Sequence, residues 1–379
     1  MSSPHPCTTL LDHFAEIPDP RTARTPVHPL PTIIGIAILA VICGADTYND
    51  IEDFGTGKDE WLATFLDLTA GVPSHDTFNR VFAAIDPVAF GAAFSHWTAS
   101  LGHSLAGVVA IDGKTSRRSH GRGKHALHMV SAWSTEAQLV FGQVAIDQKS
   151  NEITAIPALL SQLDIEKATI TIDAMGCQRD IAEQIVRQKG RYVLALKGNH
   201  GGLHDEVIDT FRVAQQEGYA DITHDMSETV NGGHGRIEKR EHTVITDTAI
   251  LEHITREHPW PHLAAVGRVH STRTQKDKTS SEDRYYLLST SMSAHEFGAS
   301  VREHWGIENR LHWSLDMTFR EDECRKRAGH SAHNFSLLRR LCLNLIRQHP
   351  RKNLSLRSRR FSANTNPKYL LSLFDMPPA

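Results

Sequence analysis

The spacing of apolar and polar residues divides the chain into a helical first part and a strand-rich second part. Within residues 1–104, the continuous apolar run Ile33–Ala45 predicts a buried helix. Ser74 predicts the N-cap of another helix, which would carry Phe78 and Phe82 on one face. We therefore expect residues 1–104 to form a helical N-terminal domain.

The pattern changes near residue 105, where short apolar or alternating runs replace helical spacing. Three strands, a helix, a strand, a helix and a strand are predicted in that order over residues 107–111, 129–133, 139–146, 153–163, 169–173, 181–189 and 192–196. This order is typical of a ribonuclease-H-like α/β core.

A long segment separates the last of these strands from the next strong helical signal. Residues 201–291 contain a short helical stretch and then strand patterns divided by turn residues, which predicts a β-rich insertion. A capping box at Ser293 and Glu296 predicts a helix that runs through Glu308 toward Leu315. The predicted domains are the N-terminal domain, a core of residues 105–200 and 292–349, the insertion 201–291, and a basic C-terminal tail 350–379.

Composition indicates the class of protein and the cellular compartment that we expect. Hydrophobic residues make up 40% of the chain and charged residues 22%, as in ordinary globular proteins. The run Ile33–Ala45 is shorter than the roughly 20 residues that cross a bilayer, and no signal-peptide pattern precedes it. We therefore expect a cytoplasmic protein with no membrane partner. Five scattered cysteines without a Cys-x-x-Cys pair predict reduced thiols.

The formal net charge of −3 hides a basic region that begins at Arg325 and continues toward the C-terminus. Such a region binds phosphates or remains a solvated end, and the sequence leaves both readings open. The pairs His125-x-x-His128 and His330-x-x-His333 have the spacing of metal ligands. Neither has a nearby cysteine pair or a clear third ligand, so we do not expect a zinc site.

Three carboxylates stand out as candidate catalytic and metal-binding groups. Asp112 and Asp173 follow apolar strands, and Glu308 lies in the much later helix. Two Mg²⁺ ions about 4 Å apart can serve the attacking and the leaving oxygen of a phosphodiester, and Mg²⁺ prefers oxygen ligands. We expect Asp112 to bridge both ions, Asp173 to complete one shell and Glu308 the other, with Mn²⁺ as a substitute.

Several cationic and aromatic side chains flank these acids in the sequence. Lys114 and Lys197 follow predicted strand ends and are candidates for neutralising phosphate oxygens, with surface lysines as the alternative. Arg236 and Arg240 in the insertion are candidates for tracking a DNA backbone, with a solvated strand face as the alternative. For Trp305 and Trp313 we favour core packing over stacking on an unpaired base.

The same motifs carry a resemblance to a known family over nearly the whole chain. The most specific block runs from Arg302 to Phe319 and contains His304-Trp305, Ile307-Glu308-Asn309 and Leu311-His312-Trp313. The other matching strings are Pro18-Asp19-Pro20-Arg21, Ile111-Asp112-Gly113-Lys114, Ile172-Asp173-Ala174-Met175, Leu194-Ala195-Leu196-Lys197-Gly198-Asn199, Gly235-Arg236-x-Glu238-x-Arg240 and Glu321-Asp322 with Asn334. The sequence resembles DDE transposases of bacterial insertion sequences, in the ISAs-type group that includes the H-repeat-associated proteins.

The resemblance implies that Asp112, Asp173 and Glu308 hold the catalytic triad positions. Related transposases place a tyrosine and an arginine before the glutamate and a lysine after it. Here Val301, His304 and Leu315 occupy those spacings, so the phosphate-contacting roles do not carry over. His304 and His312 flank Glu308 by about one helical turn each, and we expect them to contact the DNA or to pack as ordinary histidines.

By the same resemblance, the partners are double-stranded DNA, as terminal inverted repeats and target, and a second copy of the chain in a synaptic complex. The protein would be bacterial and nucleoid-associated, with the N-terminal domain serving DNA binding or assembly. Two other functions stay open from the residues: a metal-dependent nuclease that cuts without joining strands, and a DNA-binding relative without catalysis. The candidate DNA contacts are Lys114, Lys197, Arg236, Arg240, His304, His312 and Arg325.

Overall fold

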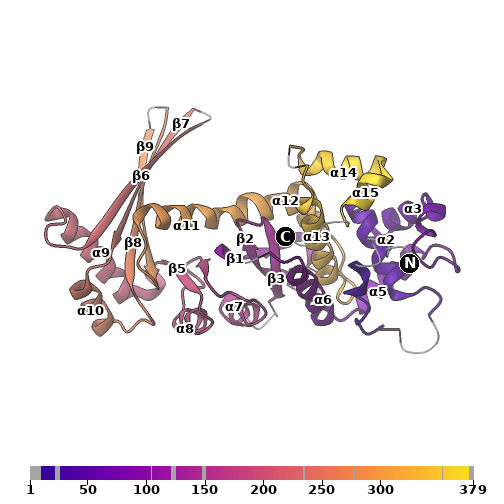
Figure 1. Ribbon diagram of the computed structural model, residues 1–379, viewed down its shortest axis with the longest axis horizontal. Coiled ribbons are helices and arrows are strands. Elements are labelled where there is room, and N and C mark those ends of the chain that lie inside the picture. The colour runs from indigo at the N-terminus through magenta and orange to yellow at the C-terminus, as the bar shows by residue number, and fades with distance from the viewer. Residues whose placement is uncertain are drawn as a thin grey trace.

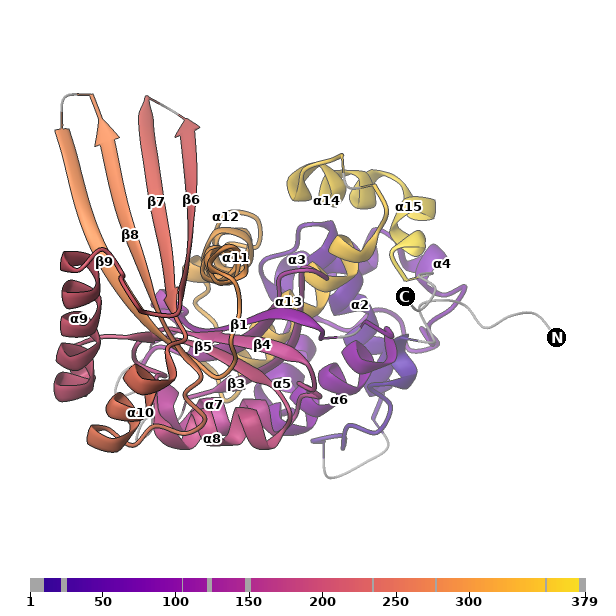
Figure 2. The ribbon, with the colours of Figure 1, turned by 60° about the vertical axis from the view of Figure 1, so that its left-hand side comes forward.

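In the part of the chain that the structure describes, nine strands form one sheet in the order β3-β2-β1-β4-β5-β9-β8-β7-β6. The computed structural model describes residues 10–21, 26–103, 105–120, 125–146, 151–233, 235–276, 278–351 and 353–374. Three residues of the sequence-based interpretation, Cys7, Lys352 and Asp375, lie outside these ranges. Figures 1 and 2 show the helical N-terminal region at one end and the long strands of the insertion at the other.

The first five strands form the ribonuclease-H-like core that the sequence predicts. β1 pairs antiparallel with β2 and β2 with β3, while β1–β4 and β4–β5 are parallel. Helices α7 and α8 connect these strands and pack on one face. The bounds are β1 Gly107–Thr115, β2 His128–Ser134, β3 Leu139–Ala145, α7 Glu152–Leu160, β4 Ala168–Ile172, α8 Arg179–Arg187 and β5 Arg191–Leu196.

One boundary in the core differs from the expectation. The first strand does not end before Asp112, because β1 continues through Thr115 and Asp112 pairs with Ser131 of β2. The parallel pairing with β4 does stop at Ile111. The apolar run therefore marks only the part of β1 that is buried between two parallel neighbours.

The insertion is rich in strands, and it extends the core sheet instead of forming a sheet of its own. β9 pairs antiparallel with β5, and two hairpins follow outward to the edge strand β6. Helix α10, which the sequence pattern did not reveal, begins after Asp247, whose carboxylate accepts from two backbone N–H groups. The bounds are α9 Gly201–Gln216, β6 His224–Gly233, β7 Arg236–Ile245, α10 Thr248–Glu257, β8 Ala265–Gln275 and β9 Lys278–Leu288.

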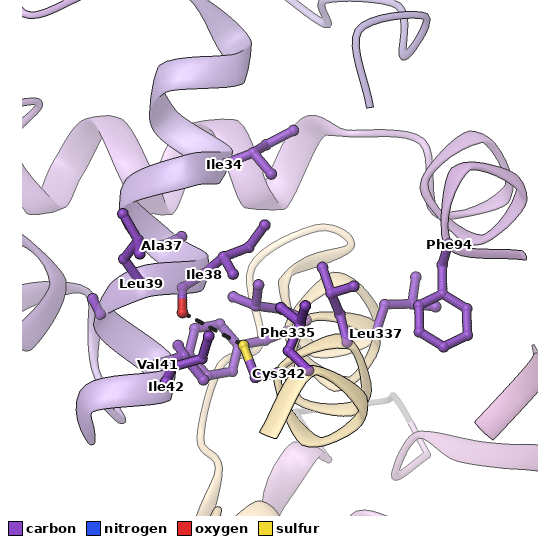
Figure 3. Packing of buried hydrophobic residues seen from close by; sticks show 14 of the residues in the cluster. Ile34, Ala37, Ile38, Leu39, Val41, Ile42, Phe94, Phe335, Leu337 and Cys342 are labelled. Atoms are coloured by element: carbon purple, nitrogen blue, oxygen red, sulfur yellow. Dashed lines mark hydrogen bonds between the residues drawn. The ribbon is translucent and has the colours of Figure 1, made fainter. Parts of the chain in front are cut away.

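The N-terminal helices are joined to the core by one shared hydrophobic cluster. Helix α13, Ser331–Gln348, is buried on nearly all sides and contacts α2, α5, α6 and β3. Figure 3 shows α2 residues such as Ile38 packed against Phe335 and Cys342 of α13, with the Cys342 thiol donating to the Ile38 carbonyl at 3.6 Å. The remaining bounds are α2 Leu30–Cys43, α3 Tyr48–Thr56, α4 Asp59–Leu62, α5 His75–Ala84 and α6 Pro87–Ser100.

Helix α2 is the buried apolar helix that the run Ile33–Ala45 predicts. Almost every residue from Leu30 to Ile42 is buried inside the protein. In the described ranges, no single helix is long and apolar enough to cross a membrane; α2 and α3 pass that test only as a pair, and they are bent by 98°.

The late helix begins at the predicted capping box, because the Ser293 side chain accepts from Glu296 N and the Glu296 carboxylate accepts from Ser293 N. α11, Ala294–Gly306, is followed without a break by a π-helical segment, Ile307–His312, and by α12, Trp313–Met317. Glu308 therefore lies in a π-helical turn, a rare geometry that is frequent at functional sites. Figure 1 shows this helical rod crossing the sheet.

The C-terminal region is more tightly bound than a solvated basic tail. Helices α14, Leu356–Thr365, and α15, Pro367–Ser372, fold back on the N-terminal helices. Arg360 donates to the carbonyls of Val41 and Ile42 at the end of α2, and Arg359 donates to the carbonyl of Ile346. The guanidinium groups of these two arginines are therefore used inside the chain, which fits neither a solvated end nor a phosphate contact at these positions.

Candidate active site

The first two acids lie side by side at the carboxyl edge of the core sheet. Ile111 and Ile172 are the last paired residues of the parallel strands β1 and β4, so Asp112 and Asp173 follow at the same level. The Asp112 carboxylate accepts from Gly113 N at 2.8 Å, and that of Asp173 accepts from Met175 N at 3.0 Å. These local bonds hold the Asp112 carboxylate against β1 and the Asp173 carboxylate in the turn that follows β4.

The helical rod brings the third acid to the same place. α11 contacts β1, β4 and β5, and the π-helical segment contacts β1, so exposed Glu308 stands near the two aspartates. Burial raises the pKa of Asp112 to about 7, and repulsion from Asp173, Glu152 and Glu308 acts in the same direction. The sequence-predicted acids are therefore close enough to repel one another across one site.

The chemistry of these groups fits a hard divalent cation, which carboxylate oxygens bind well and which would relieve their repulsion. As they stand, however, the side chains are not arranged as a finished cage. Over the described ranges, no group of three or more His, Cys, Asp or Glu residues converges closely enough to hold a metal ion. Glu308 is on an exposed turn, so its side chain has room to swing toward the aspartates.

Of the two candidate histidines, His312 contacts a candidate acid directly, and His304 lies beside β4 within the electrostatic influence of Asp173. His304 Nδ1 lies 3.0 Å from the hydroxyl of Thr171, and His312 Nδ1 lies 3.7 Å from Asp112 Oδ2. Burial lowers the pKa of His304, and burial together with Arg340 and Lys114 lowers that of His312 to about 3. Both rings are therefore neutral at physiological pH.

The two candidate lysines have different surroundings. Lys114 is 7% exposed and its Nζ lies 2.7 Å from Asp316 and 3.2 Å from Asp322, so its charge is matched inside the chain. Lys197 is exposed directly after β5. The following loop is tied to the second acid, because Asn199 Nδ2 donates to the carbonyl of Ala174 at 2.8 Å.

The candidate arginines of the insertion belong to a larger set on one face of the long strands. α11 packs on this face, where Phe297 contacts His242 and Tyr286. Side chains alternate along a strand, so the pairing register places a further set of arginines on the same face. Together with Arg302 of α11, which is near Arg240, the basic face consists of Arg236, Arg240, Arg273, Arg284 and Arg302.

The basic face is only partly neutralised by acids. Arg240 pairs with Glu238 at 2.6 Å and Arg284 pairs with Glu282 at 2.8 Å. Arg236 lies at the hairpin tip, opposite Gly233. The remaining candidate, Arg325, is exposed in the segment before α13, beside a cavity lined by residues of α3 and α5, and it is separate from the basic face.

Both tryptophans of the late block are exposed, so the expectation that they pack in the core is wrong. Trp305 is 40% exposed and Trp313 is 57% exposed. The guanidinium of Arg284 lies over the Trp305 ring at 5.2 Å from the ring centre, a cation–π contact. Trp305 thus connects the basic face to the turn that carries Glu308.

Four charged residues of the site and the basic face were not among the candidate site residues from the sequence, although Arg302 begins the most specific matching block: Glu152, Arg273, Arg284 and Arg302. The place of Arg284 and Arg302 on the basic face can be recognised only once the register of β9 and the orientation of α11 are known. Glu152 opens α7, where acidic residues are common for helix-dipole reasons alone. Its closeness to Asp112 depends on tertiary packing.

Fold and acids together define a ribonuclease-H-like protein with a carboxylate-lined site. The chain belongs to the DDE transposase family: residues 103–345 match the family model described as "Transposase DDE domain". Residues 11–98 match the model described as "DDE_Tnp_1-associated". The resemblance drawn from the motifs is thereby confirmed.

The curated relatives are similar over most of their length. The chain is 43% identical over 345 residues to "Putative transposase YncI" of Escherichia coli O157:H7, covering 89% of this chain and 87% of the relative. It is 38% identical over 372 residues to "H repeat-associated putative transposase YhhI" of E. coli K12, covering 96% and 97%. A solved piggyBac transposase synaptic complex with hairpin DNA matches with a TM-score of 0.48 at 9% identity, covering 98% of this chain and 80% of that one, which is too weak to support a conclusion.

Proposed function

We propose that the protein is an insertion-sequence transposase that cleaves DNA at the ends of its element and joins those ends to target DNA. The observation that carries this proposal is the placement of Asp112 and Asp173 on adjacent parallel strands beneath the helical rod that bears Glu308. Family membership supports the same chemistry, because the carboxylates of a transposase DDE domain can supply oxygen ligands to the divalent cations that assist phosphodiester cleavage and transfer.

Asp112, Asp173 and Glu308 would hold divalent cations, with Mg²⁺ as the expected ion and Mn²⁺ as a substitute. Bound there, the ions activate the attacking oxygen and stabilise the leaving oxygen of the phosphodiester. The chain itself orients the carboxylates: backbone N–H groups hold both aspartates, and the π-helical turn presents Glu308. His304 and His312, neutral and close to the acids, are proposed to orient the scissile strand by hydrogen bonds.

The DNA duplex would lie along the basic face and reach the acids past Trp305. Arginine side chains on neighbouring strands can contact successive phosphates, which gives affinity without sequence information. Arg236 and Arg240 were candidates for this role from the sequence, and Lys197 beside the catalytic edge remains one. We do not assign Lys114 to phosphate, because its ammonium is held by Asp316 and Asp322.

The N-terminal helices, the insertion and exposed Arg325 are proposed to recognise the terminal inverted repeats together. Two element ends have to be held at once for joining, so we propose that a homodimer forms in the synaptic complex. The protein would act in the bacterial cytoplasm, associated with the nucleoid. The domain division, residues 1–104, 105–200 with 292–349, 201–291 and 350–379, stays part of this proposal.

The test is incubation of the purified full-length chain with Mg²⁺ and DNA that carries the element ends. We expect nicking at the end, and its loss in Asp112→Ala, Asp173→Ala and Glu308→Ala. Undiminished nicking in any one variant contradicts the assignment. A second assay for joining to target DNA separates a transposase from a nuclease that only cuts. DNA binding without any cleavage in the unaltered chain would identify a catalytically inactive relative.

A further inference from the structure

Glu152 is an acidic residue near the catalytic aspartates to which the proposed chemistry assigns no task. It is the first residue of α7, and its Oε1 lies 2.7 Å from His128 Nε2. The other ring nitrogen, His128 Nδ1, lies 2.7 Å from the hydroxyl of Thr115 near the end of β1. Because an ionised carboxylate only accepts hydrogen bonds, Nε2 carries the ring proton and Nδ1 accepts from the hydroxyl. The three side chains form a chain that fixes the direction of the Glu152 carboxylate.

Gly113 shows how closely this pair approaches the catalytic strand. Residues alternate along β1, so Asp112 faces the helical rod while Gly113 faces α7. A Cβ atom placed on Gly113 would lie 2.2 Å from both Glu152 Oε1 and His128 Nε2, a distance that no side chain can adopt. The pair therefore rests directly on the backbone of the residue that follows Asp112, in space that only glycine leaves open.

At Gly113 no side chain separates Glu152 from β1, so the charge of Glu152 acts electrostatically on the site from the other face of the sheet. Because Glu152 lies against the backbone of Gly113, its carboxylate is one residue along β1 from Asp112. The Glu152 and His128 side chains also line a cavity of about 610 Å³ that extends to Met175, two residues beyond Asp173. Glu152 is 15% exposed, so its charge is only partly screened by water.

We propose that Glu152 is a positioning residue of the catalytic centre, which acts through Asp112 to strengthen the hold on divalent cations, with His128 and Thr115 keeping it in place. This inference rests on the proposed function, because it presupposes that Asp112 binds such a cation. It adds a fourth carboxylate, contributed from the opposite face of the sheet. It also explains the glycine after Asp112 by the space that the Glu152–His128 pair occupies.

The experiment measures Mg²⁺ and Mn²⁺ binding to the full-length chain by isothermal titration calorimetry in the absence of DNA. Glu152→Gln keeps an oxygen for His128 and removes the charge, and we expect roughly ten-fold or greater loss of Mg²⁺ affinity, as for residues that support metal ligands. The matched control is Glu183→Gln on α8, where the side chain is 55% exposed, and its affinity should equal that of the unaltered chain. Nicking by Glu152→Gln should recover at saturating Mg²⁺, which a purely structural defect would not allow.

Two further variants keep the inference testable if Glu152→Gln does not fold. Thr115→Val, at an exposed position, removes only the hydrogen bond to His128, and we expect a smaller loss of Mg²⁺ affinity with unchanged far-ultraviolet circular dichroism. Asp112→Asn serves as the reference for lost cation binding. If Asp112→Asn loses binding while Glu152→Gln and Thr115→Val stay within two-fold of the unaltered chain, the inference is wrong and the proposed function stands. If Asp112→Asn binds Mg²⁺ as well as the unaltered chain, both fail.

Discussion

The ammonium of Lys114 lies 2.7 Å from the carboxylate of Asp316, which links strand β1 to helix α12. A second carboxylate, Asp322, lies 3.2 Å from the same nitrogen. This lysine follows the first catalytic acid by two residues, the position from which it was expected to contact phosphate. The structure instead places the Lys114 side chain, which is 7% exposed, between two acids. We therefore expect it to stabilise the fold.

Lys114→Met tests that role, because methionine keeps much of the apolar stem and removes the charge. We expect the free energy of unfolding in urea to fall by roughly 1–3 kcal/mol, the cost of leaving partly buried carboxylates without their partner. Affinity for nonspecific DNA should stay within two-fold. The control is Lys368→Met on exposed α15, which should change neither quantity. A large loss of DNA affinity with unchanged stability would instead indicate that Lys114 contacts phosphate.

The buried pair of Glu321 and Arg340, 2.7 Å apart, gives a pH prediction. Burial alone would raise the pKa of Glu321, but Arg340, Arg339 and Lys114 outweigh it and hold that pKa at about 2. The group therefore contributes stability above its unfolded pKa of 4.5, and this stability is lost as pH falls from about 4.5 toward 2. Urea unfolding at a series of pH values measures the loss.

Glu321→Gln should make that acid limb of the stability profile shallower. At pH 7 it should lower the free energy of unfolding by about 3–5 kcal/mol, because Arg340 is left buried without its anion. Glu217→Gln, at an exposed position after α9, is the control and should leave the profile unchanged. Identical acid limbs for Glu321→Gln and the unaltered chain would show that the pair does not titrate in this way.

Arg240, Arg284 and Arg302 on the basic face predict a salt dependence of DNA binding. If each contacts one phosphate, each alanine variant should reduce the slope of log affinity against log salt by about 0.9. Fluorescence anisotropy with labelled duplex at several salt concentrations measures the slope. Arg256→Ala on α10, 70% exposed and away from this face, should leave it unchanged. Equal slopes for all four variants would remove the basic face from the proposed DNA path.

The exposure of Trp305 and Trp313 predicts that replacing either ring affects DNA binding more than the free energy of unfolding. Alanine at Trp313, which is 57% exposed, should change the free energy of unfolding by no more than about 0.5 kcal/mol. Trp305→Ala also removes the contact with Arg284, so it should cost roughly 0.5–1 kcal/mol. If they stack on bases at an opened element end, each variant should weaken binding of that DNA by about 1–3 kcal/mol. Duplex without an unpaired end is the control substrate and should bind normally. An equal loss on both substrates would indicate a backbone contact instead of stacking.

The arrangement of the core could be predicted from sequence because its signals are local. Apolar runs that end near Asp112 and Asp173, and a capping box before Glu308, specify strands and a helix whose order allows one topology. The family match over residues 103–345 confirms the family. The three acids could be selected as candidates without any knowledge of their neighbours.

The remaining features depend on which groups tertiary packing brings together. A count of basic residues does not reveal that Arg360 caps the end of α2 or that Arg340 neutralises Glu321. The face on which Trp313 lies follows from the π-helical segment Ile307–His312 before it, because this segment shifts later residues relative to α-helical periodicity. Glu152 shows no local signal, since only the gap at Gly113 connects it to Asp112.

The pairing of β9 with β5 has a consequence for how such proteins diversify. The arginine-bearing hairpins and Asp112 belong to one hydrogen-bonded sheet, so the sheet itself sets the distance between the proposed DNA contacts and the proposed cleavage site. Adding a residue to each arm of a hairpin would carry its tip about 3.4 Å farther out, close to the rise of one base pair. The length of the hairpins would then set the number of base pairs between the proposed DNA contacts and the proposed cleavage point. Relatives with longer or shorter hairpins would differ in this distance.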